Sequence, residues 1–262
     1  TIKGQSVSLD ETLGSCLPEK QRRLYEGLNI SGWADAEVKV RTSDESSPAD
    51  VEAEIQLTQA SLRPNYLPLE ASDVSGRISI ASDFIDMENL KGKCGSGVVS
   101  ADGRIWPGAE TSGLRYDLTL RGDQIELNGK LFDALPKSLE TIVSWLKPTG
   151  KVNYVAIVNK GAGADRPALN LSVDCLGNSL NLESFPYPLK NVTGNLMIAA
   201  DQIGDGSDKT AGGISARGVK ETMRITGRLA QVDEESGAGH FDLVLGDVRV
   251  FSRDKGNKRI DL

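Results

Sequence analysis

The residue types that most often carry out chemistry are few in this sequence and stand far apart. The one histidine, His240, falls at the edge of an expected strand, where a lone histidine is more often structural than catalytic. No serine stands in a G-x-S-x-G elbow, and no G-x-x-x-x-G-K-[ST] phosphate loop occurs. Carboxylates are plentiful but scattered along the polar faces of expected strands, so none is paired for acid–base catalysis. The sequence predicts no catalytic residue and no enzyme.

Two segments superficially resemble ligand-binding loops, and both are interpreted as turns. Gly92, Gly95 and Gly97 suggest a phosphate cradle, but no helix pattern follows them, so a tight bend between two strands is expected. The segment from Asp201 to Asp208 resembles a calcium loop. Its third position is Ile203, where an oxygen ligand is needed, and no glutamate closes the loop. The sequence predicts no cofactor and no metal site.

The overall composition is that of a folded globular chain and disfavours some classes of partner. Of the 262 residues, 39% are hydrophobic and 26% are charged. A net charge of −7 argues against nucleic acid, which requires a basic face. Cys16, Cys94 and Cys175 form no C-x-x-C pair, so a disulfide framework is not expected, although a single disulfide remains open. Thr1 lies inside an expected strand with no signal peptide before it, so the chain is expected to be a piece of a longer protein.

Alternating apolar and polar residues predict a chain built mainly of short antiparallel strands. In VEAEIQLT, from Val51 to Thr58, every second residue is apolar. Two helical segments, from Leu17 to Leu28 and from Leu135 to Leu146, each have a proline in the first turn and an apolar stripe. The expected strands cover residues 2–9, 36–40, 51–58, 74–80, 84–90, 96–105, 114–120, 124–131, 152–158, 169–173, 180–182, 192–198, 223–229, 241–245 and 248–251. Strands do not alternate with long helices, so a parallel α/β sheet is disfavoured.

Part of the first half of the sequence recurs at a constant offset of 118 residues, the separation of Pro18 from Pro136. LGSCLPEKQRRLYEGLNISG, from residue 13, matches LFDALPKSLETIVSWLKPTG, from residue 131. LPLEASDVSGRISI, from residue 67, matches FPYPLKNVTGNLMI, from residue 185. The register then slips, and Gly103–Ile105 resembles Gly227–Leu229. The sequence predicts two tandem units, residues 1–125 and 126–262, in one continuous sheet rather than as independent domains.

The expected strands leave one apolar face that two short helices are too small to cover. At ~4.8 Å per strand, roughly 13 strands make on the order of 60 Å of sheet. An apolar surface of that size greatly exceeds the patches normal on a monomer, so its inner side needs a second sheet, a helix or lipid. The residues expected to line a lipid-binding face are Val51, Ala53, Ile55, Leu57, Leu114, Tyr116, Leu118, Val152, Tyr154, Ala156, Leu169, Leu171, Val173, Phe241, Leu243 and Leu245. If the sheet instead folds onto itself as a sandwich, these residues are ordinary core.

The repeated segments resemble the AsmA-like proteins of bacterial envelopes, the relatives of AsmA, TamB and YhdP. The resemblance rests on the proline-led helix that stops at a glycine and on the pattern P-x-x-x-x-x-V-x-G-x-[IL]. This pattern occurs from Pro68 to Ile78 and from Pro186 to Leu196. The resemblance covers nearly the whole chain, and the glycine-rich loops after each V-x-G strand depart from it. It implies a long, curved antiparallel sheet that forms a groove, similar in plan to the bridge-like lipid transfer proteins of eukaryotes.

The function that this resemblance implies is lipid handling in the cell envelope. The expected partner is phospholipid or another acyl lipid, and the expected role is phospholipid transport between the inner and outer membranes or outer-membrane biogenesis. The resemblance also implies a periplasmic location and an inner-membrane anchor that is not in this chain, which has no run of eighteen apolar residues. The alternative is a tandem β-sandwich that serves as an interaction or scaffold module of a surface or periplasmic protein. No nucleic-acid partner is expected.

Overall fold

The structure is a computed structural model in which the chain is mainly β, with an antiparallel sheet that is not closed. It describes residues 1–16, 19–41, 50–63, 70–81, 83–106, 114–133, 143–144, 146–162, 164, 167–181, 189–200, 222–231 and 241–251. Within these ranges, side chains are described up to residue 199, apart from residues 16, 19–21, 23, 24, 40, 41, 50 and 51. The chain forms two compact units. The first comprises Thr1–Gly122 with Asn159–Gly163, and the second Asp123–Val158 with Ala164–Leu262.

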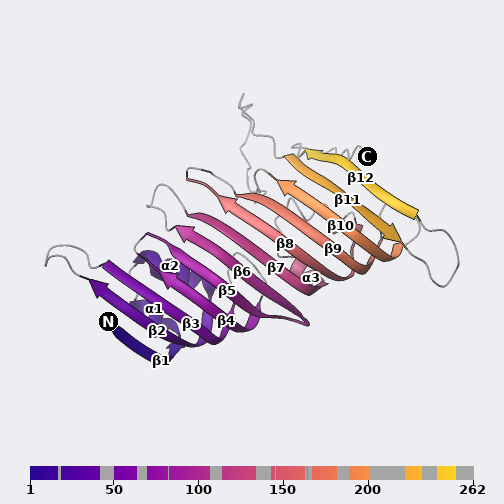
Figure 1. The fold of residues 1–262 in the computed structure, drawn as a ribbon. Helices are drawn as coiled ribbons and strands as arrows, with labels where there is room; N and C mark the ends of the chain where they lie inside the picture. The colour runs from indigo at the N-terminus through magenta and orange to yellow at the C-terminus, as the bar shows by residue number, and fades with distance from the viewer. Residues whose placement is uncertain are drawn as a thin grey trace. The chain divides into compact units, whose positions relative to one another are not determined.

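The strands of the first unit lie beside one another in chain order (Figure 1). They are β1 (Ile2–Leu9), β2 (Ile30–Arg41), β3 (Asp50–Leu62), β4 (Ala71–Ile80), β5 (Ile85–Cys94), β6 (Gly97–Trp106) and the first part of β7 (Arg115–Leu127). Neighbours pair antiparallel from β1 to β6, and Gly95 and Ser96 form the turn between β5 and β6, as the sequence predicted.

Bulges interrupt several of these strands at residues that adopt a left-handed backbone conformation. Ser6, Asp73 and Asn89 have φ angles of 50°, 51° and 51°, and the register shifts beside each of them. The backbone N–H of Ser6 donates to Asp35 Oδ1 on β2 at 2.9 Å, and that of Asn89 donates to Asp102 Oδ1 on β6 at 2.8 Å. A bulge bends its strand and increases the local twist, so these positions curve the sheet of this unit.

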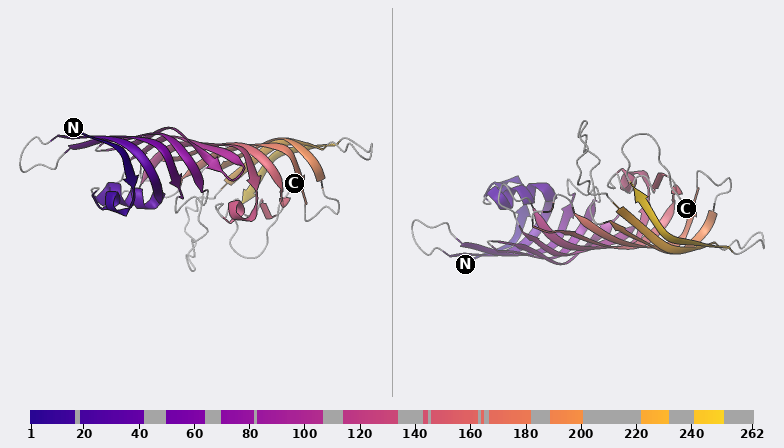
Figure 2. Two further views of the ribbon diagram at one scale, coloured as in Figure 1. Left: turned by 90° about the horizontal axis from the view of Figure 1, so that it is seen from below. Right: turned by 90° about the horizontal axis from the view of Figure 1, so that it is seen from above.

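Two helices, α1 (Glu11–Cys16) and α2 (Glu19–Leu28), connect β1 to β2 and lie on one face of the first unit (Figure 2). Asp10 caps α1, because its Oδ1 accepts hydrogen bonds from the N–H of Thr12 at 2.9 Å and of Leu13 at 3.1 Å. The sequence predicted α2 but not α1, which is too short to show an apolar stripe. The expected start of α2, at Leu17 and Pro18, lies outside the described residues.

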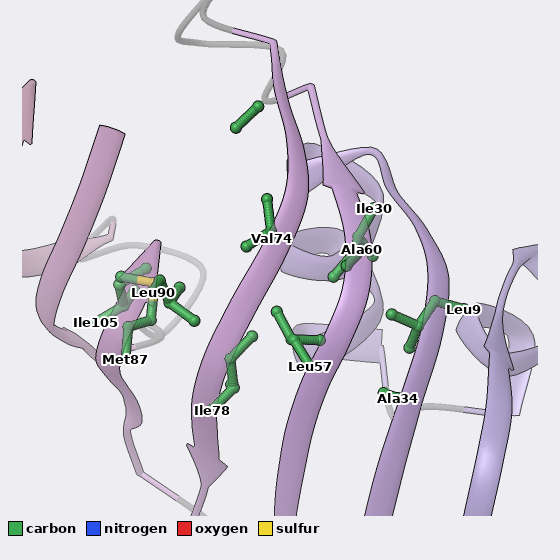
Figure 3. Packing of buried hydrophobic residues seen from close by; sticks show 11 residues of the cluster. Leu9, Ile30, Ala34, Leu57, Ala60, Val74, Ile78, Met87, Leu90 and Ile105 are labelled. Atoms are coloured by element: carbon green, nitrogen blue, oxygen red, sulfur yellow. The ribbon is translucent and has the colours of Figure 1, made fainter. Parts of the chain in front are cut away.

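The face of the sheet that carries the helices is also the face that holds the core of the first unit, and we call it the inner face. Figure 3 shows its buried side chains gathered on one side of the strands. The buried residues are Leu9, Ile30, Ala34, Leu57, Ala60, Ala71, Val74, Ile78, Met87, Leu90 and Ile105. Leu13 of α1 and Tyr25 and Leu28 of α2 pack against them. The two helices therefore help to bury this core through their apolar side chains.

The second unit begins in β7 and continues with α3 (Gly129–Phe132), β8 (Gly150–Lys160), β9 (Ala168–Leu180), β10 (Leu189–Ala200), β11 (Thr222–Gln231) and β12 (Phe241–Phe251). Its strands also follow chain order, and β9 to β12 pair antiparallel. Its buried apolar residues are Ile125, Leu146, Val152, Ala156, Leu169, Leu180, Leu189, Val192, Leu196 and Ile198. Val143, Ser144 and Leu146 are helical, and most of the remaining helix expected from Leu135 lies outside the described residues.

Three pairs of expected strands are single strands in the structure. Residues 114–120 and 124–131 fall largely in β7, whose Gln124 has a φ of 57°, and α3 replaces the expected strand after Leu127. Residues 169–173 and 180–182 are joined in β9, which ends at Leu180, and residues 241–245 and 248–251 are joined in β12. An extra residue at a bulge shifts the apolar alternation by one position while strand pairing continues, so a broken alternation was wrongly interpreted as a strand end.

Candidate functional site

The candidate site in the first unit is a row of apolar residues across the inner face, at the edge of the buried core. Strand pairing aligns Val38 of β2, Ala53 of β3, Ile80 of β4, Ile85 of β5 and Ile105 of β6. We call these five residues the open row. Ile105 is buried, whereas the other four are only half-buried by the described residues. An apolar row that is left partly in water could gain by contact with an apolar ligand.

The next row toward the helices is more deeply buried. It aligns Ala36, Ile55, Ile78 and Met87, of which Ile78 and Met87 are buried and the other two half-buried. Beyond it, Ala34 pairs with Leu57, and both are 1% exposed. On β2 to β5, burial of the inner face therefore increases from the open row toward the helices, whereas on β6 Ile105 is buried and Gly103 beside it is half-buried.

The predicted lining residues of the first unit share this inner face. Leu57 is buried, while Ala53, Ile55, Leu114, Tyr116 and Leu118 are half-buried. All of these except Ala53 belong to the core cluster or pack against it, and Ala53 stands in the open row. Val51 pairs with Val40 at the end of β3, and its side chain lies outside the described part of the chain. The structure therefore brings these first-unit positions onto one surface.

The predicted lining residues of the second unit lie on β8, β9 and β12. Val152, Ala156 and Leu169 are buried, and Tyr154, Leu171 and Val173 are half-buried. In the pairing of β9 with β10, Leu171 lies opposite Ile198 and Val173 opposite Leu196, and both partners are buried. Phe241, Leu243 and Leu245 lie in β12, and their side chains are outside the described set.

Several residues of this surface were not among the predicted lining residues, chiefly Val38, Ile80, Ile85, Met87 and Ile105. Each lies on a strand that the sequence predicted at least in part, so alternation within these strands carried a signal for them. In β5 the signal is weak, because the bulge at Asn89 puts two residues rather than one between Met87 and Leu90, the next buried side chain. The open row is recognised only once the strand register is known.

Across β2 to β6, the inner face offers an apolar, uncharged surface. On the described parts of β2 to β6, the inner-facing positions hold only aliphatic residues, methionine, glycine and cysteine. Burial raises the pKa of the Tyr116 hydroxyl, so this group stays protonated at neutral pH. Burial, with a smaller contribution from Glu70, raises the pKa of Cys94 at the end of β5, so its thiol is also neutral. Among the described residues, no three histidine, cysteine or carboxylate side chains gather as a metal site.

The opposite, outer face of the first unit is polar and forms ion pairs. Lys93 pairs with Asp73 at 2.9 Å, and Arg121 pairs with Asp102 at 3.0 Å. Arg104 pairs with Asp86 and lies over the ring of Phe84, 4.1 Å from its centroid. Exposed ion pairs of this kind contribute little to stability. We therefore interpret the outer face as a water-exposed surface and place the candidate site on the inner face.

Of the helices within the described residues, none is long and apolar enough to cross a lipid bilayer. Comparison of the chain with protein-family models found no match, and comparisons with curated proteins and with solved structures found none either.

Proposed function

We propose that this chain is a lipid-binding segment of an AsmA-like cell-envelope protein, in which the inner face forms a groove for acyl chains. The observation that carries the proposal is the open row, in which Val38, Ala53, Ile80 and Ile85 are only half-buried. Fully burying a side chain such as isoleucine is worth roughly 1.5–3 kcal/mol, so an acyl chain along this row would be stabilised by several partial contributions.

The strand arrangement supports a groove over the alternative of tandem β-sandwiches. A sandwich needs two sheets packed face to face, with connections that cross between them. In the first unit, each strand from β1 to β7 instead lies beside its neighbours in the chain within one sheet. The described elements that lie against the inner face of this sheet are α1 and α2, and they leave the open row partly exposed.

The proposal includes two copies of one structural unit, and backbone angles at the sequence offset of 118 residues support it. Non-glycine residues seldom adopt a positive φ, so its recurrence at matched positions is informative. The matched pairs are Ser6 and Gln124 (50° and 57°), Asn29 and Lys147 (45° and 42°), Asp73 and Asn191 (51° and 54°), Gly32 and Gly150 (116° and 103°), and Gly76 and Gly194 (137° and 124°). Most of these pairs differ in residue type, so the backbone repeats more faithfully than the sequence.

Hydrogen bonds at the same offset give independent support. The N–H of Ser6 donates to the Asp35 carboxylate, and the N–H of Gln124 donates to the Asn153 side-chain oxygen, both at 2.9 Å. The N–H of Arg63 donates to the carbonyl oxygen of Leu28. At the matched positions, the N–H of Asn181 donates to the carbonyl oxygen of Leu146.

The copies that we propose end near Ile80 and Ile198. Sequence alone matched Gly103–Ile105 of β6 with Gly227–Leu229 of β11. However, β11 pairs directly with β10, whereas β5 lies between β6 and β4, the strand that corresponds to β10. The two segments therefore occupy different places in the sheet, and this part of the sequence match does not extend the repeat.

The biological role that we propose is phospholipid transport between the inner and outer membranes, or outer-membrane biogenesis, in the periplasm. The inner face supports the binding part of this role, because its described positions on β2 to β6 are apolar and uncharged, which suits acyl chains better than polar ligands. No catalytic step is part of the proposal.

Native mass spectrometry of the chain purified from a bacterial membrane extract, with solvent extraction of the same sample, tests the proposal. We expect bound phospholipid, and we expect Ile80→Asp to lose most of it because a carboxylate in the open row would have to be desolvated. Ser79→Asp is the matched control, since it adds the same charge at the next residue of β4, on the outer face, and should keep the lipid. A lipid-free mass for the folded wild-type chain, with no uptake of added phospholipid, would overturn the proposed function and favour a scaffold role.

A further inference from the structure

The inner face of the first unit carries a charged residue at one end, and a hydrogen bond locates it. Asn159 Nδ2 of β8 donates to Asp117 Oδ1 of β7 at 3.1 Å. Asp117 is exposed, and Tyr116 beside it packs against the core of the inner face. Because successive side chains of a strand point to opposite faces, Lys160 follows Asn159 onto the same face as Tyr116. The two residues are therefore neighbours on adjacent strands of this face.

The polar ends of these two side chains are available to a ligand. Lys160 is half-buried, and its ammonium group forms no ion pair with any residue that the structure describes. The Tyr116 hydroxyl likewise forms no hydrogen bond within the described part of the chain, and the raised pKa of Tyr116 keeps it a donor at neutral pH. The methylene groups of Lys160 can lie along apolar surface while its ammonium group stays at the edge.

We propose that Lys160 and Tyr116 bind the phosphate of an acyl lipid whose chains lie along the inner face of the first unit. A lysine ammonium offers three donors and a full positive charge, and charge-assisted hydrogen bonds to phosphate are stronger than neutral ones. The tyrosine hydroxyl adds one neutral hydrogen bond. Leu118, the next inner-facing residue after Tyr116 on β7, begins the apolar surface for the chains. This inference rests on the proposed function and adds to it a headgroup class and a direction for the lipid.

The test compares two lipids with identical acyl chains, palmitoyl-oleoyl phosphatidylglycerol and palmitoyl-oleoyl glycerol, which lacks the phosphate. The full chain is incubated with each lipid in detergent micelles, and bound copies are counted by native mass spectrometry. We expect wild-type protein to take up the phosphatidylglycerol in preference. Lys160→Gln should reduce that preference roughly five-fold, and Tyr116→Phe should reduce it less, in keeping with the strengths of charged and neutral hydrogen bonds.

The matched control is Lys151→Gln, which removes the same charge from β8. Lys151 precedes the buried Val152 and therefore points to the outer face, so this variant should keep the wild-type preference. Equal losses in Lys151→Gln and Lys160→Gln would overturn the headgroup site, as would an equal loss of both lipids in Lys160→Gln. The second experiment measures the binding of inorganic phosphate by calorimetry. If phosphate bound as tightly as the lipid, the site would be a site for free anions and not for a lipid headgroup. Failure of the proposed function is distinguishable, because the wild-type chain would then bind neither lipid.

Discussion

Ala60 in the first unit and Asn178 in the second correspond in the repeat that we propose, and each is 1% exposed. A Cβ added to Gly32 would collide with the backbone of Gln59 and Ala60. A Cβ added to Gly150 would come within 3.0 Å of Asn178 Nδ2. The same close approach of two strands is therefore filled by bare backbone in one unit and by a side-chain amide in the other.

The amide in the second unit makes hydrogen bonds that an alanine lacks. Asn178 Oδ1 accepts from the N–H of Leu176 at 2.8 Å, and its Nδ2 donates to the carbonyl oxygen of Thr149 at 3.0 Å. Thr149 and Ser179 are also bridged by two backbone hydrogen bonds. One backbone arrangement can therefore be held by apolar packing or by a buried, hydrogen-bonded polar group.

The largest expected effect is that of alanine at the two glycines. Gly32→Ala should destabilise the pairing of β2 with β3 by about 3 kcal/mol, because a positive φ is strained for alanine and its methyl group meets backbone that cannot move aside. Gly150→Ala should cost about half as much in the pairing of β8 with β9, since the amide of Asn178 can shift. Native-state hydrogen exchange of the amides in these strands measures both effects.

Alanine at a third glycine measures the cost of backbone strain without a steric collision. Gly95→Ala lies in a turn with a φ of 58° and nothing within 4 Å of the added methyl group, so it should cost only about 1–2 kcal/mol. Equal costs at Gly32 and Gly150 would show that collision does not distinguish the two units.

A smaller effect is expected when the second unit is made to resemble the first. Asn178→Ala should destabilise the pairing of β8 with β9 by about 2 kcal/mol, because the buried amide is lost and the Leu176 N–H and the Thr149 carbonyl oxygen lose their hydrogen bonds to it. Chemical denaturation, read by hydrogen exchange in β8 and β9, measures the loss.

Asn195→Ala serves as the control for Asn178→Ala. Asn195 also makes two hydrogen bonds, to Ser172 Oγ and Asp174 Oδ1, but it is only half-buried and water can replace them. Its removal should cost less than 1 kcal/mol, in line with exposed hydrogen bonds. A similar loss from both variants would mean that burial of Asn178 contributes nothing.

The smallest expected effect is a difference in pH dependence between the helix caps of the two units. Asp10 caps α1 and Asn128 caps α3, each accepting from the N–H of a leucine three residues later. The hydrogen bond from the Leu13 N–H, followed by one from Ser8, holds the pKa of Asp10 below its ordinary value of 3.8. The cap on α1 should therefore be complete above pH 3.8 and be lost as the pH falls through the lowered pKa, whereas the Asn128 cap should not titrate.

Amide chemical shifts of Leu13 and Leu131 between pH 7 and pH 2 measure this difference. Asp10→Asn should make the first cap as insensitive to pH as the second. A parallel titration of both leucine amides in the wild-type chain would instead point to a general acid transition.

The sequence predicted the strands better than their bulges and cross-strand contacts. Alternation identified at least part of every described strand, and the tandem repeat stays a prediction. Bulges at Ser6 and Gln124 were not predicted, because a serine or a glutamine with a positive φ has no signature in a single sequence. The different roles of Ala60 and Asn178 were also not predicted, because they depend on which residues lie opposite on the neighbouring strand.

The candidate site shows the same limit. The inner-facing residues of β3 and β7 were predicted because their alternation is clean over several positions. Ile80 and Ile85 were not in the predicted set, and they join the site through their pairing across β4 and β5. Lys160 enters it only through the hydrogen bond between Asn159 and Asp117, a contact between residues 42 positions apart.

The chain-order arrangement of strands has a consequence for how each unit reaches its native state. Each described strand pairs with strands that are adjacent to it in the chain, so contacts in each unit close comparatively short loops. Closing a short loop costs less entropy than closing a long one, and topologies with local contacts fold faster than those that join distant segments. We expect each unit to assemble progressively during synthesis, with β1 and β2 pairing around α1 and α2 before the later strands have left the ribosome.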